Sequence, residues 1–237
     1  MKSILIICGA LTLITSIALA DGISLAWNDC LGAGGATNRT FACNTNVGNN
    51  DLYVSFDPPT DVPDVNGAQV IIDITTPTSS GSIPPWWQLQ RNTGCRITSL
   101  STADARGSCV SLFGGGSIGY YVTAVDPSMP PNWARIVATD QVPQASAFPV
   151  TAGTEYTVMV IRIKNANTVG TACSGCADPL CLALFWVLLH TNNSGDVLMS
   201  NPLPRACAGA PGAWVSWQSI ATPTLDRTWG QIKTLYR

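Results

Sequence analysis

One short segment carries the pattern of a catalytic nucleophile. The G-x-S-x-G pattern, in which a strained turn between a strand and a helix exposes a serine hydroxyl, occurs at Gly115-Gly116-Ser117-Ile118-Gly119. The chain's one histidine, His190, lies downstream with aspartates in between, which is the order of a hydrolase triad. The residues after the pattern, however, continue as the strand-like run Tyr120 to Thr123 and not as a helix. A secreted hydrolase that uses Ser117 and His190 is therefore the alternative hypothesis.

Paired carboxylates would support glycoside hydrolysis, which needs two acidic groups several ångström apart, one of them with a raised pKa. The chain has 14 acidic residues, of which one, Glu155, is a glutamate, and no spacing among them picks out a pair. Glu155 directly precedes a strand-like run, where a solvated charge at the start of a strand explains it. An Asp/Glu pair stays within the hydrolase alternative without further assigned residues.

Oxygen ligands gather in one proline-rich segment that contains Asp57, Asp61, Asp64 and Asn66. Hard oxygen ligands from such loops bind calcium in many extracellular β-domains. The spacing does not match an EF-hand loop, and Asp and Asn also form turns without a metal. Calcium is the one cofactor that the sequence offers, and turn formation explains the same residues without it.

Tryptophan is the most prominent candidate for ligand binding. Eight tryptophans are many for a chain of this length, and aromatic rings on a sandwich face hold sugars in many binding modules. In a strand, Trp86 and Trp87 would point to opposite faces, one toward the core and one toward solvent. We predict a ligand platform at Trp86 or Trp87 with Gln88 and Arg91 beside it. The competing interpretation places these indoles in the core with their N–H groups satisfied internally.

Cysteine usage predicts disulfides. An even number of cysteines follows the N-terminal segment, as in disulfide-stapled proteins of oxidising compartments. The eight residues are Cys30, Cys43, Cys95, Cys109, Cys173, Cys176, Cys181 and Cys207. The first four form two couples of similar spacing around turn-rich segments, which predicts Cys30–Cys43 and Cys95–Cys109. Bridges that close loops of this size stabilise a fold by roughly 3 kcal/mol each in the chain-entropy model.

The last four cysteines allow alternative pairings, and we favour Cys173–Cys181 with Cys176–Cys207. A zinc site would use the same sulfurs as thiolates, but an oxidising compartment favours sulfur–sulfur bonds. A redox Cys-x-x-Cys would open a helix, whereas a proline and a strand-like run follow this one. Structural disulfides are therefore the preferred interpretation.

The N-terminal segment has the features of a cleaved export signal. Lys2 precedes an apolar run that ends at Ala18-Leu19-Ala20, a small-x-small cleavage pattern. Threonine and serine interrupt the run, which makes a membrane anchor the weaker interpretation. We predict a signal peptide over residues 1–20 and a mature chain that is secreted, periplasmic or on the cell surface, without a membrane span.

Charge is sparse in the mature chain. Removal of Lys2 leaves 11 basic against 14 acidic residues, a formal charge of −3, with no basic cluster. Nucleic acid is excluded as a partner, because binding to phosphates needs clustered Lys and Arg. No linker-like stretch divides the chain, so residues 21–237 are predicted to form a single domain.

Period-two and β-branched runs recur between turn signals. They are Ile23 to Trp27, Leu52 to Phe56, Gln69 to Thr75, Trp86 to Gln90, Ile118 to Val125, Ala134 to Thr139, Glu155 to Lys164, Cys181 to His190 and Ala213 to Trp217. Thr157, Met159, Ile161 and Ile163 share one face and predict a strand with one side at the core. The run from Cys181 to Leu189 is apolar on both faces and predicts a central strand. The pattern indicates an all-β fold, a two-sheet antiparallel β-sandwich stapled by disulfides.

Several short motifs resemble those of a family of exported bacterial proteins. They are Trp27-Asn28-Asp29-Cys30, Pro85-Trp86-Trp87-Gln88, Gly94-Cys95-Arg96, Gly153-Thr154-Glu155-Tyr156, Cys173-Ser174-Gly175-Cys176 and the ending Arg227 to Arg237. The resemblance covers most of the mature chain. It implies export and assigns no activity, so no catalytic residue carries over. The ending is also similar to the last residues of otherwise unrelated exported bacterial proteins, which makes residues 222–237 either a sorting tail or a closing segment.

These features predict a secreted or cell-surface β-sandwich without catalytic activity. Aromatic-rich strands and disulfides are present, whereas no convincing catalytic constellation is found in the sequence. The expected role is binding of a polysaccharide or of another surface protein, or construction of part of the cell envelope.

Overall fold

The computed structural model describes residues 22–77, 81–89, 95–103, 107–113, 120–124, 130–170, 173–200, 207 and 212–218, with 120–124 described by the backbone alone. Four predictions fall outside these residues: the signal peptide over 1–20, Arg91, Ser117 and the ending over 222–237. Within the described residues, no helix has the length and apolar character needed to cross a membrane.

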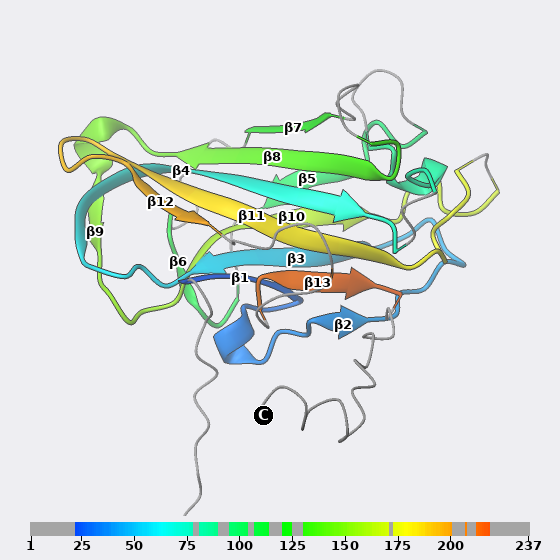
Figure 1. Cartoon of the computed structure of the whole chain (residues 1–237), viewed down its shortest axis with the longest axis horizontal. Helices are drawn as coiled ribbons and strands as arrows, with labels where there is room; N and C mark the ends of the chain where they lie inside the picture. The colour runs from blue at the N-terminus through cyan, green and yellow to red at the C-terminus, as the bar shows by residue number, and fades with distance from the viewer. Residues whose placement is uncertain are drawn as a thin grey trace, which may run out of the picture.

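Two β-sheets lie one over the other (Figure 1). The smaller sheet has the strand order β1-β3-β10-β5, and β6 also pairs with β10. Its strands are β1 (Ile23–Trp27), β3 (Asn49–Phe56), β5 (Leu100–Ala103), β6 (Val110–Ser111) and β10 (Tyr156–Lys164). The pairs are antiparallel except for β6 with β10, which is parallel.

The larger sheet has the order β2-β13-β11-β4-β8-β7, with β12 paired to β11 and β9 paired to β4. Its strands are β2 (Asn38–Arg39), β4 (Val62–Thr75), β7 (Tyr120–Ala124), β8 (Trp133–Gln141), β9 (Phe148–Val150), β11 (Leu180–Thr191), β12 (Val197–Ser200) and β13 (Trp214–Trp217). The short pair β13 and β2 is parallel, and the others are antiparallel. Three single 3-10 turns, η2 (Leu31–Ala33), η3 (Pro85–Trp87) and η4 (Gln144–Ser146), lie in connections. The predicted all-β two-sheet sandwich is confirmed.

Alternation along the strands builds the core between the sheets. On β8, Ala134, Ile136 and Ala138 are buried, whereas Arg135 and Val137 between them are partly exposed. The inward residues of the large sheet meet those of the small sheet in one apolar cluster. Each large apolar side chain buried in this way contributes about 1.5–3 kcal/mol.

The predicted core face of β10 is correct for three of its four residues. Met159, Ile161 and Ile163 belong to the core cluster. The register with β3 shifts between Thr157 and Met159, so Thr157 lies opposite Ser55 on the other face of the sheet. The extra residue of such a bulge breaks the period-two pattern, which is why Thr157 leaves the predicted face.

A cluster of aromatic rings fills one end of the core. The ring of Trp217 on β13 lies 4.0 Å from that of Phe41 and 4.9 Å from that of Trp86, centroid to centroid. Trp27 on β1 and Trp87 contact it edge-on at 5.9 and 5.1 Å. Because these rings come from both sheets and from the connections between them, the cluster joins the two layers.

All eight predicted cysteines form disulfides, which confirms the framework, but none of the predicted pairs is formed. The bonds are Cys30–Cys109, Cys43–Cys176, Cys95–Cys173 and Cys181–Cys207. Three of the four bridges span 78 to 133 residues and join loops that meet only in the folded chain. Bridges over such long loops remove more entropy from the unfolded chain than the local bridges that we predicted, about 4 kcal/mol or more each in the chain-entropy model.

Candidate functional site

The predicted ligand platform at Trp86 and Trp87 is wrong, because both rings are buried. Their exposed fractions are 0% and 1%, and they lie in the 3-10 turn η3, where a strand was predicted. The side chain of Gln88 makes an intramolecular hydrogen bond, in which its Nε2 donates to the carbonyl of Ile83 at 3.3 Å. The competing interpretation is therefore correct in placing these indoles in the core. Trp86 Nε1 donates to Thr168 Oγ1 at 3.1 Å, whereas the buried Trp87 Nε1 has no hydrogen-bond partner among the described residues.

Trp86 instead supports a buried arginine. Arg96 is 1% exposed, and its Cζ lies 3.5 Å from the centroid of the Trp86 ring. Its guanidinium donates to the carbonyls of Trp86, Ala166 and Lys164. Burial lowers the pKa of Arg96 to about 9. The side chain thus joins the segment around η3 to the end of β10 and is not available to a ligand.

The four residues predicted to bind calcium do not form one site. Asp57 Oδ1 accepts the N–H of Gly153 at 2.8 Å, and Asp61 Oδ1 accepts the N–H of Ala152 at 2.8 Å. Both carboxylates therefore hold the loop before β10. Among the described residues, no group of three His, Cys, Asp or Glu side chains close enough to share a metal includes these aspartates.

Asp64 and Asn66 hold a different loop, the hairpin between β11 and β12. Asp64 Oδ2 accepts the N–H of Asn193 at 2.6 Å, and Asn66 Nδ2 donates to Asn192 Oδ1 at 2.7 Å. Hydrogen bonds from this hairpin lower the pKa of Asp64. These contacts support the turn-forming interpretation, because the four residues serve two separate loops.

His190 pairs with an aspartate that the hydrolase hypothesis did not use. Its Nδ1 lies 2.9 Å from Asp196 Oδ2, across the hairpin between β11 and β12. Asp196 Oδ1 also accepts the N–H of Thr191 at 3.2 Å. This partly exposed hydrogen-bonded pair closes the end of the hairpin. Ser117 lies outside the described residues, so its relation to His190 stays a prediction.

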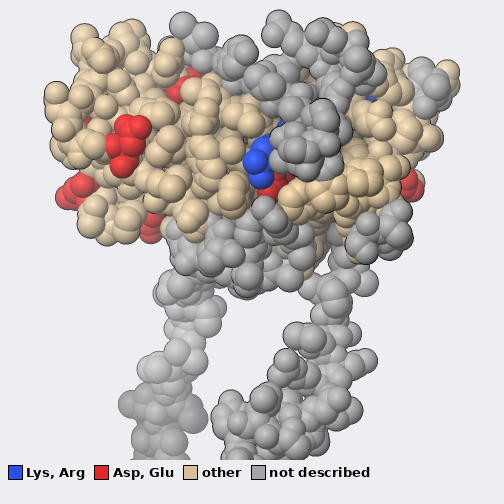
Figure 2. Space-filling view, turned by 45° about the horizontal axis from the view of Figure 1, so that its top comes forward, with Lys and Arg blue, Asp and Glu red and all other residues tan. Residues whose placement is uncertain are grey.

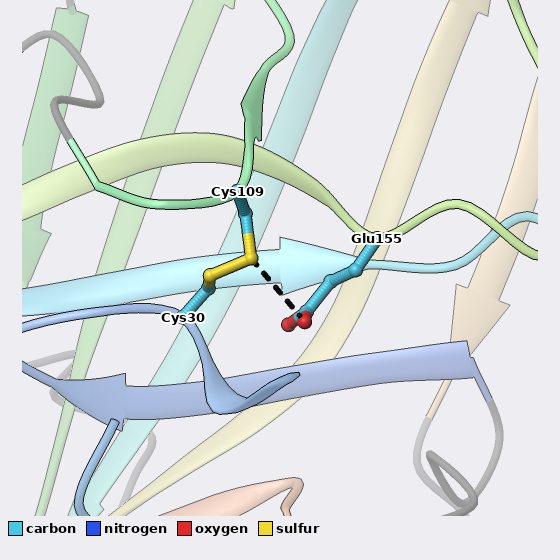
Figure 3. A group of neighbouring side chains, drawn as sticks. All are labelled: Cys30, Cys109 and Glu155. Carbon is cyan, nitrogen blue, oxygen red and sulfur yellow. Dashed lines mark hydrogen bonds between the residues drawn. A yellow bond between two sulfur atoms is a disulfide. The ribbon is translucent and has the colours of Figure 1, made fainter. Parts of the chain in front are cut away.

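Glu155 is hydrogen-bonded in a polar cluster on the small sheet, where a solvated charge was expected (Figure 3). Its Oε1 accepts the hydroxyls of Ser55 at 2.5 Å and Ser24 at 3.2 Å. Its Oε2 accepts the N–H of Gly32 at 2.8 Å and lies 3.4 Å from Cys109 Sγ. The carboxylate therefore fastens the loop after β1 and the loop before β6 to the ends of β1 and β3.

The same cluster is the one place in the described residues where metal-ligand atoms converge. Cys30, Cys109 and Glu155 offer two sulfurs and a carboxylate oxygen within 4.8 Å of one another. Both sulfurs, however, belong to one disulfide, which leaves no thiolate to bind a cation. The group is a covalent staple, not a metal centre.

Asp29 supports this staple from the other side. Its carboxylate accepts the N–H of Cys30, the N–H of Ser108 and the hydroxyl of Ser108 at 2.8 to 2.9 Å. Burial raises the pKa of Asp29, but these hydrogen bonds outweigh that effect and hold the pKa below its ordinary value. Two carboxylates thus stabilise the loops that cross the outer side of the small sheet.

The outer face of the large sheet, which points away from the small sheet, carries a row of apolar side chains. Residues directly opposite each other in antiparallel strands point to the same face. Val137 on β8 lies opposite Ile71 on β4, and Ile71 lies opposite Trp186 on β11. Two residues beyond Trp186, Leu188 lies opposite Leu198 on β12. We call these five residues, which cross four neighbouring strands, the outer stripe.

A β-bulge on β11 adds a second ring beside the stripe. The register with β4 shifts between Leu184 and Trp186, which leaves Phe185 without a residue opposite it. An extra residue of this kind allows consecutive side chains to lie on one face. Arg135, on the outer face of β8, has its Cζ 5.2 Å from the centroid of the Phe185 ring. That contact places Phe185 on the outer face next to Trp186.

The outer stripe is accessible and has little charge around it. Leu198 is 60% exposed, and the other four residues are partly exposed. The charged neighbours on the same face, Arg135 and Asp73, pair through hydrogen bonds of 2.6 and 3.0 Å. In the view of Figure 2, most of the described surface is formed by residues other than Lys, Arg, Asp and Glu. The stripe is therefore a surface suited to apolar contact.

The sequence contained one signal for this surface. The run from Cys181 to Leu189 is apolar on both faces, which predicted a central strand. The prediction is correct, because β11 pairs with β4 on one side and with β13 and then β12 on the other. In a two-layer sandwich, however, the second apolar face of a strand has no sheet to cover it. A run that is apolar on both faces in such a fold therefore indicates an outward apolar surface.

Comparisons with known proteins report a distant likeness in fold. No family model matches the sequence, and no curated protein matches it. The fold is similar to that of the second type II cohesin module from the cellulosomal adaptor ScaA scaffoldin of Acetivibrio cellulolyticus, with 13% sequence identity and a TM-score of 0.35. The match covers 74% of this chain and 88% of that chain. At this level of similarity no functional residue carries over.

Proposed function

We propose that the mature chain is an exported, non-catalytic module that binds another protein through the outer stripe. The observation that carries this proposal is the row of partly exposed apolar side chains across four neighbouring strands. Contiguous apolar surface is unfavourable in water and is typical of protein–protein contact sites. A partner with a complementary apolar surface would remove it from water.

The proposal favours a protein over a polysaccharide because of the polar groups near the stripe. A sugar site needs a ring face together with polar groups that bond the sugar hydroxyls. Next to the stripe, Gln69 Nε2 donates to Thr139 Oγ1 at 3.4 Å, and Arg135 is paired with Asp73. These groups already bond each other, while the aliphatic members of the stripe offer only apolar contact.

Export is supported by the cysteines. Four disulfides join all eight cysteines that follow the predicted signal peptide. Disulfides form and persist in oxidising compartments. Together with the signal peptide predicted over residues 1–20, this supports a protein that works in the periplasm, at the cell surface or outside the cell.

The test is capture of exported and envelope proteins from the producing cells on the immobilised mature chain, followed by binding measurements with the purified partner. The variants are Leu188→Lys and Trp186→Ser, which place a charge or a polar group in the outer stripe. Each is expected to weaken binding at least tenfold, a change of about 1.4 kcal/mol. The matched control is Val47→Lys, because Val47 is 80% exposed and lies in the loop before β3. The control is expected to bind as the unchanged chain does.

Three outcomes would overturn the proposal. The first is a partner that binds all three variants as tightly as the unchanged chain. The second is retention on immobilised polysaccharides that the stripe variants lose, which would assign the surface to glycans. The third is covalent capture of Ser117 by a fluorophosphonate probe, which would make the protein a hydrolase.

A further inference from the structure

Among the residues that the structure describes, strand β12 forms an open edge of the large sheet. Its one strand partner there is β11, and no backbone hydrogen bond from another described residue reaches its other side. The edge of β1, by contrast, is covered, since the N–H groups of Leu25 and Trp27 donate to the carbonyls of Gly212 and Ala36. The edge of β13 is paired with β2. An open edge offers unpaired N–H and C=O groups to another strand.

The four residues of β12 lack two common protections of such an edge, a charged side chain and a proline. The strand reads Val-Leu-Met-Ser and contains neither a charged residue nor a proline, the devices that commonly block pairing with another chain. Its central outward residue, Leu198, is 60% exposed. The open edge β5, in comparison, carries the polar residues Ser101 and Thr102. β12 is therefore an apolar edge that lies beside the outer stripe.

We propose that two copies of the chain associate by pairing their β12 strands antiparallel across a two-fold axis. The strand is self-complementary in this arrangement. With Leu198 opposite the partner's Leu198, Val197 faces the partner's Met199, and Asp196 faces the partner's Ser200. No like charges meet, and the opposed leucine side chains start from Cβ atoms about 5 Å apart in such a pair.

The pairing would join the two large sheets into one continuous sheet. The outer stripes of the two copies would then meet at the leucine pair and form one longer apolar surface. Two-fold association of this kind uses the same patch on both copies and closes without further growth. The inference stands on the open edge of β12 and does not depend on a partner for the outer stripe.

The test is sedimentation velocity of the mature, disulfide-bonded chain over a broad concentration series. A reversible monomer–dimer equilibrium is expected. Leu198→Lys, which adds a charge where edges are commonly protected, is expected to weaken it at least tenfold. The matched control is Ile97→Lys, at a residue that is 47% exposed and lies outside both sheets. The control is expected to leave the equilibrium unchanged.

A second variant tests the register. Leu198→Cys brings two thiols together at the predicted leucine pair, so a disulfide-linked dimer is expected on mild oxidation, measured by non-reducing electrophoresis and intact mass. Ile97→Cys is the control for random oxidation. A monomer at every concentration, a dimer that tolerates Leu198→Lys, or equal cross-linking of the two cysteine variants would overturn the proposal.

Discussion

Leu188 on β11 lies directly opposite Leu198 on β12, on the face of the large sheet that points away from the core. The next residue of β11, Leu189, lies opposite Val197 and points inward with no exposed surface. One step along the strand thus separates a core residue from a surface residue of the same type. Strand β11 is apolar on both faces, but the small sheet covers only one of them.

This difference between the two faces predicts that replacing a leucine by alanine lowers the free energy of unfolding much more on the inner face than on the outer face. Leu189→Ala is expected to lower the free energy of unfolding by about 2–5 kcal/mol, because it leaves a cavity in the core. Leu198→Ala is expected to change it by less than about 0.5 kcal/mol, because the side chain is mainly in solvent. Urea unfolding with the disulfides intact measures both. Equal losses would show that the two faces of the sheet are wrongly assigned.

The disulfide pattern predicts which thiol each cysteine substitution sets free. Cys43→Ser is expected to leave Cys176 free, not Cys30, since Cys43 is bonded to Cys176. Alkylation of the folded variant followed by peptide mass mapping identifies the labelled residue. Loss of this bridge is expected to cost about 2–5 kcal/mol of stability. Labelling of Cys30 would instead support the local pairing that spacing alone predicts.

Arg96 is expected to be far more sensitive than an arginine at the surface. Arg96→Lys keeps the charge but loses the planar fork that bonds three carbonyls, so a loss of about 3 kcal/mol is expected. The control is Arg162→Lys, where a partly exposed ion pair with Asp51 is expected to contribute about 1 kcal/mol or less. Similar losses of stability in the two variants, measured by urea unfolding, would contradict the conclusion that Arg96 joins the segment around η3 to the end of β10.

The lowered pKa of Asp29 predicts that the protein loses stability in acid. Because its pKa in the folded chain lies below the ordinary value of 3.8, the carboxylate contributes stability above that pH. The contribution disappears as the pH falls through the lower folded value. Ser108→Ala removes a hydrogen bond to the carboxylate, so it is expected to raise the pKa of Asp29 and to reduce this acid-dependent loss.

The measurement for Asp29 is the unfolding free energy above and below pH 3.8, together with NMR titration of the Asp29 carboxyl. Ser146→Ala is the control, since Ser146 is exposed in η4. An unchanged titration of Asp29 in Ser108→Ala would show that these hydrogen bonds do not set its pKa.

Local patterns predicted the strands and the fold class, because alternation along a strand is visible in neighbouring residues. The inward residues Ala134, Ile136 and Ala138 of β8 follow this alternation, and Asp140 is the buried polar exception at the end of the strand. The prediction from alternation failed at β-bulges, where the faces of Thr157 and Phe185 are shifted by one residue from the period-two pattern. A bulge depends on the neighbouring strand, which a local pattern does not contain.

Long-range contacts could not be predicted from spacing. Cys30 and Cys43 are close in sequence, yet each is bonded to a cysteine in a distant loop. Trp86 and Trp87 begin a run that predicted a strand, whereas both rings pack on Trp217 in the core. The tertiary fold determines which side chains are exposed. For this reason the sequence alone predicted neither the burial of Trp86 and Trp87 nor the exposure of the outer stripe.

The binding role of the outer stripe is tested most directly by site-specific photo-cross-linking in the producing cells. A photoreactive residue such as benzoylphenylalanine is placed at Leu188 in one variant and at Val47 in another. We expect position 188 to cross-link to one defined exported or envelope protein, and position 47 not to do so. Cross-linking of that protein from position 47 and not from position 188 would contradict a binding role of the outer stripe.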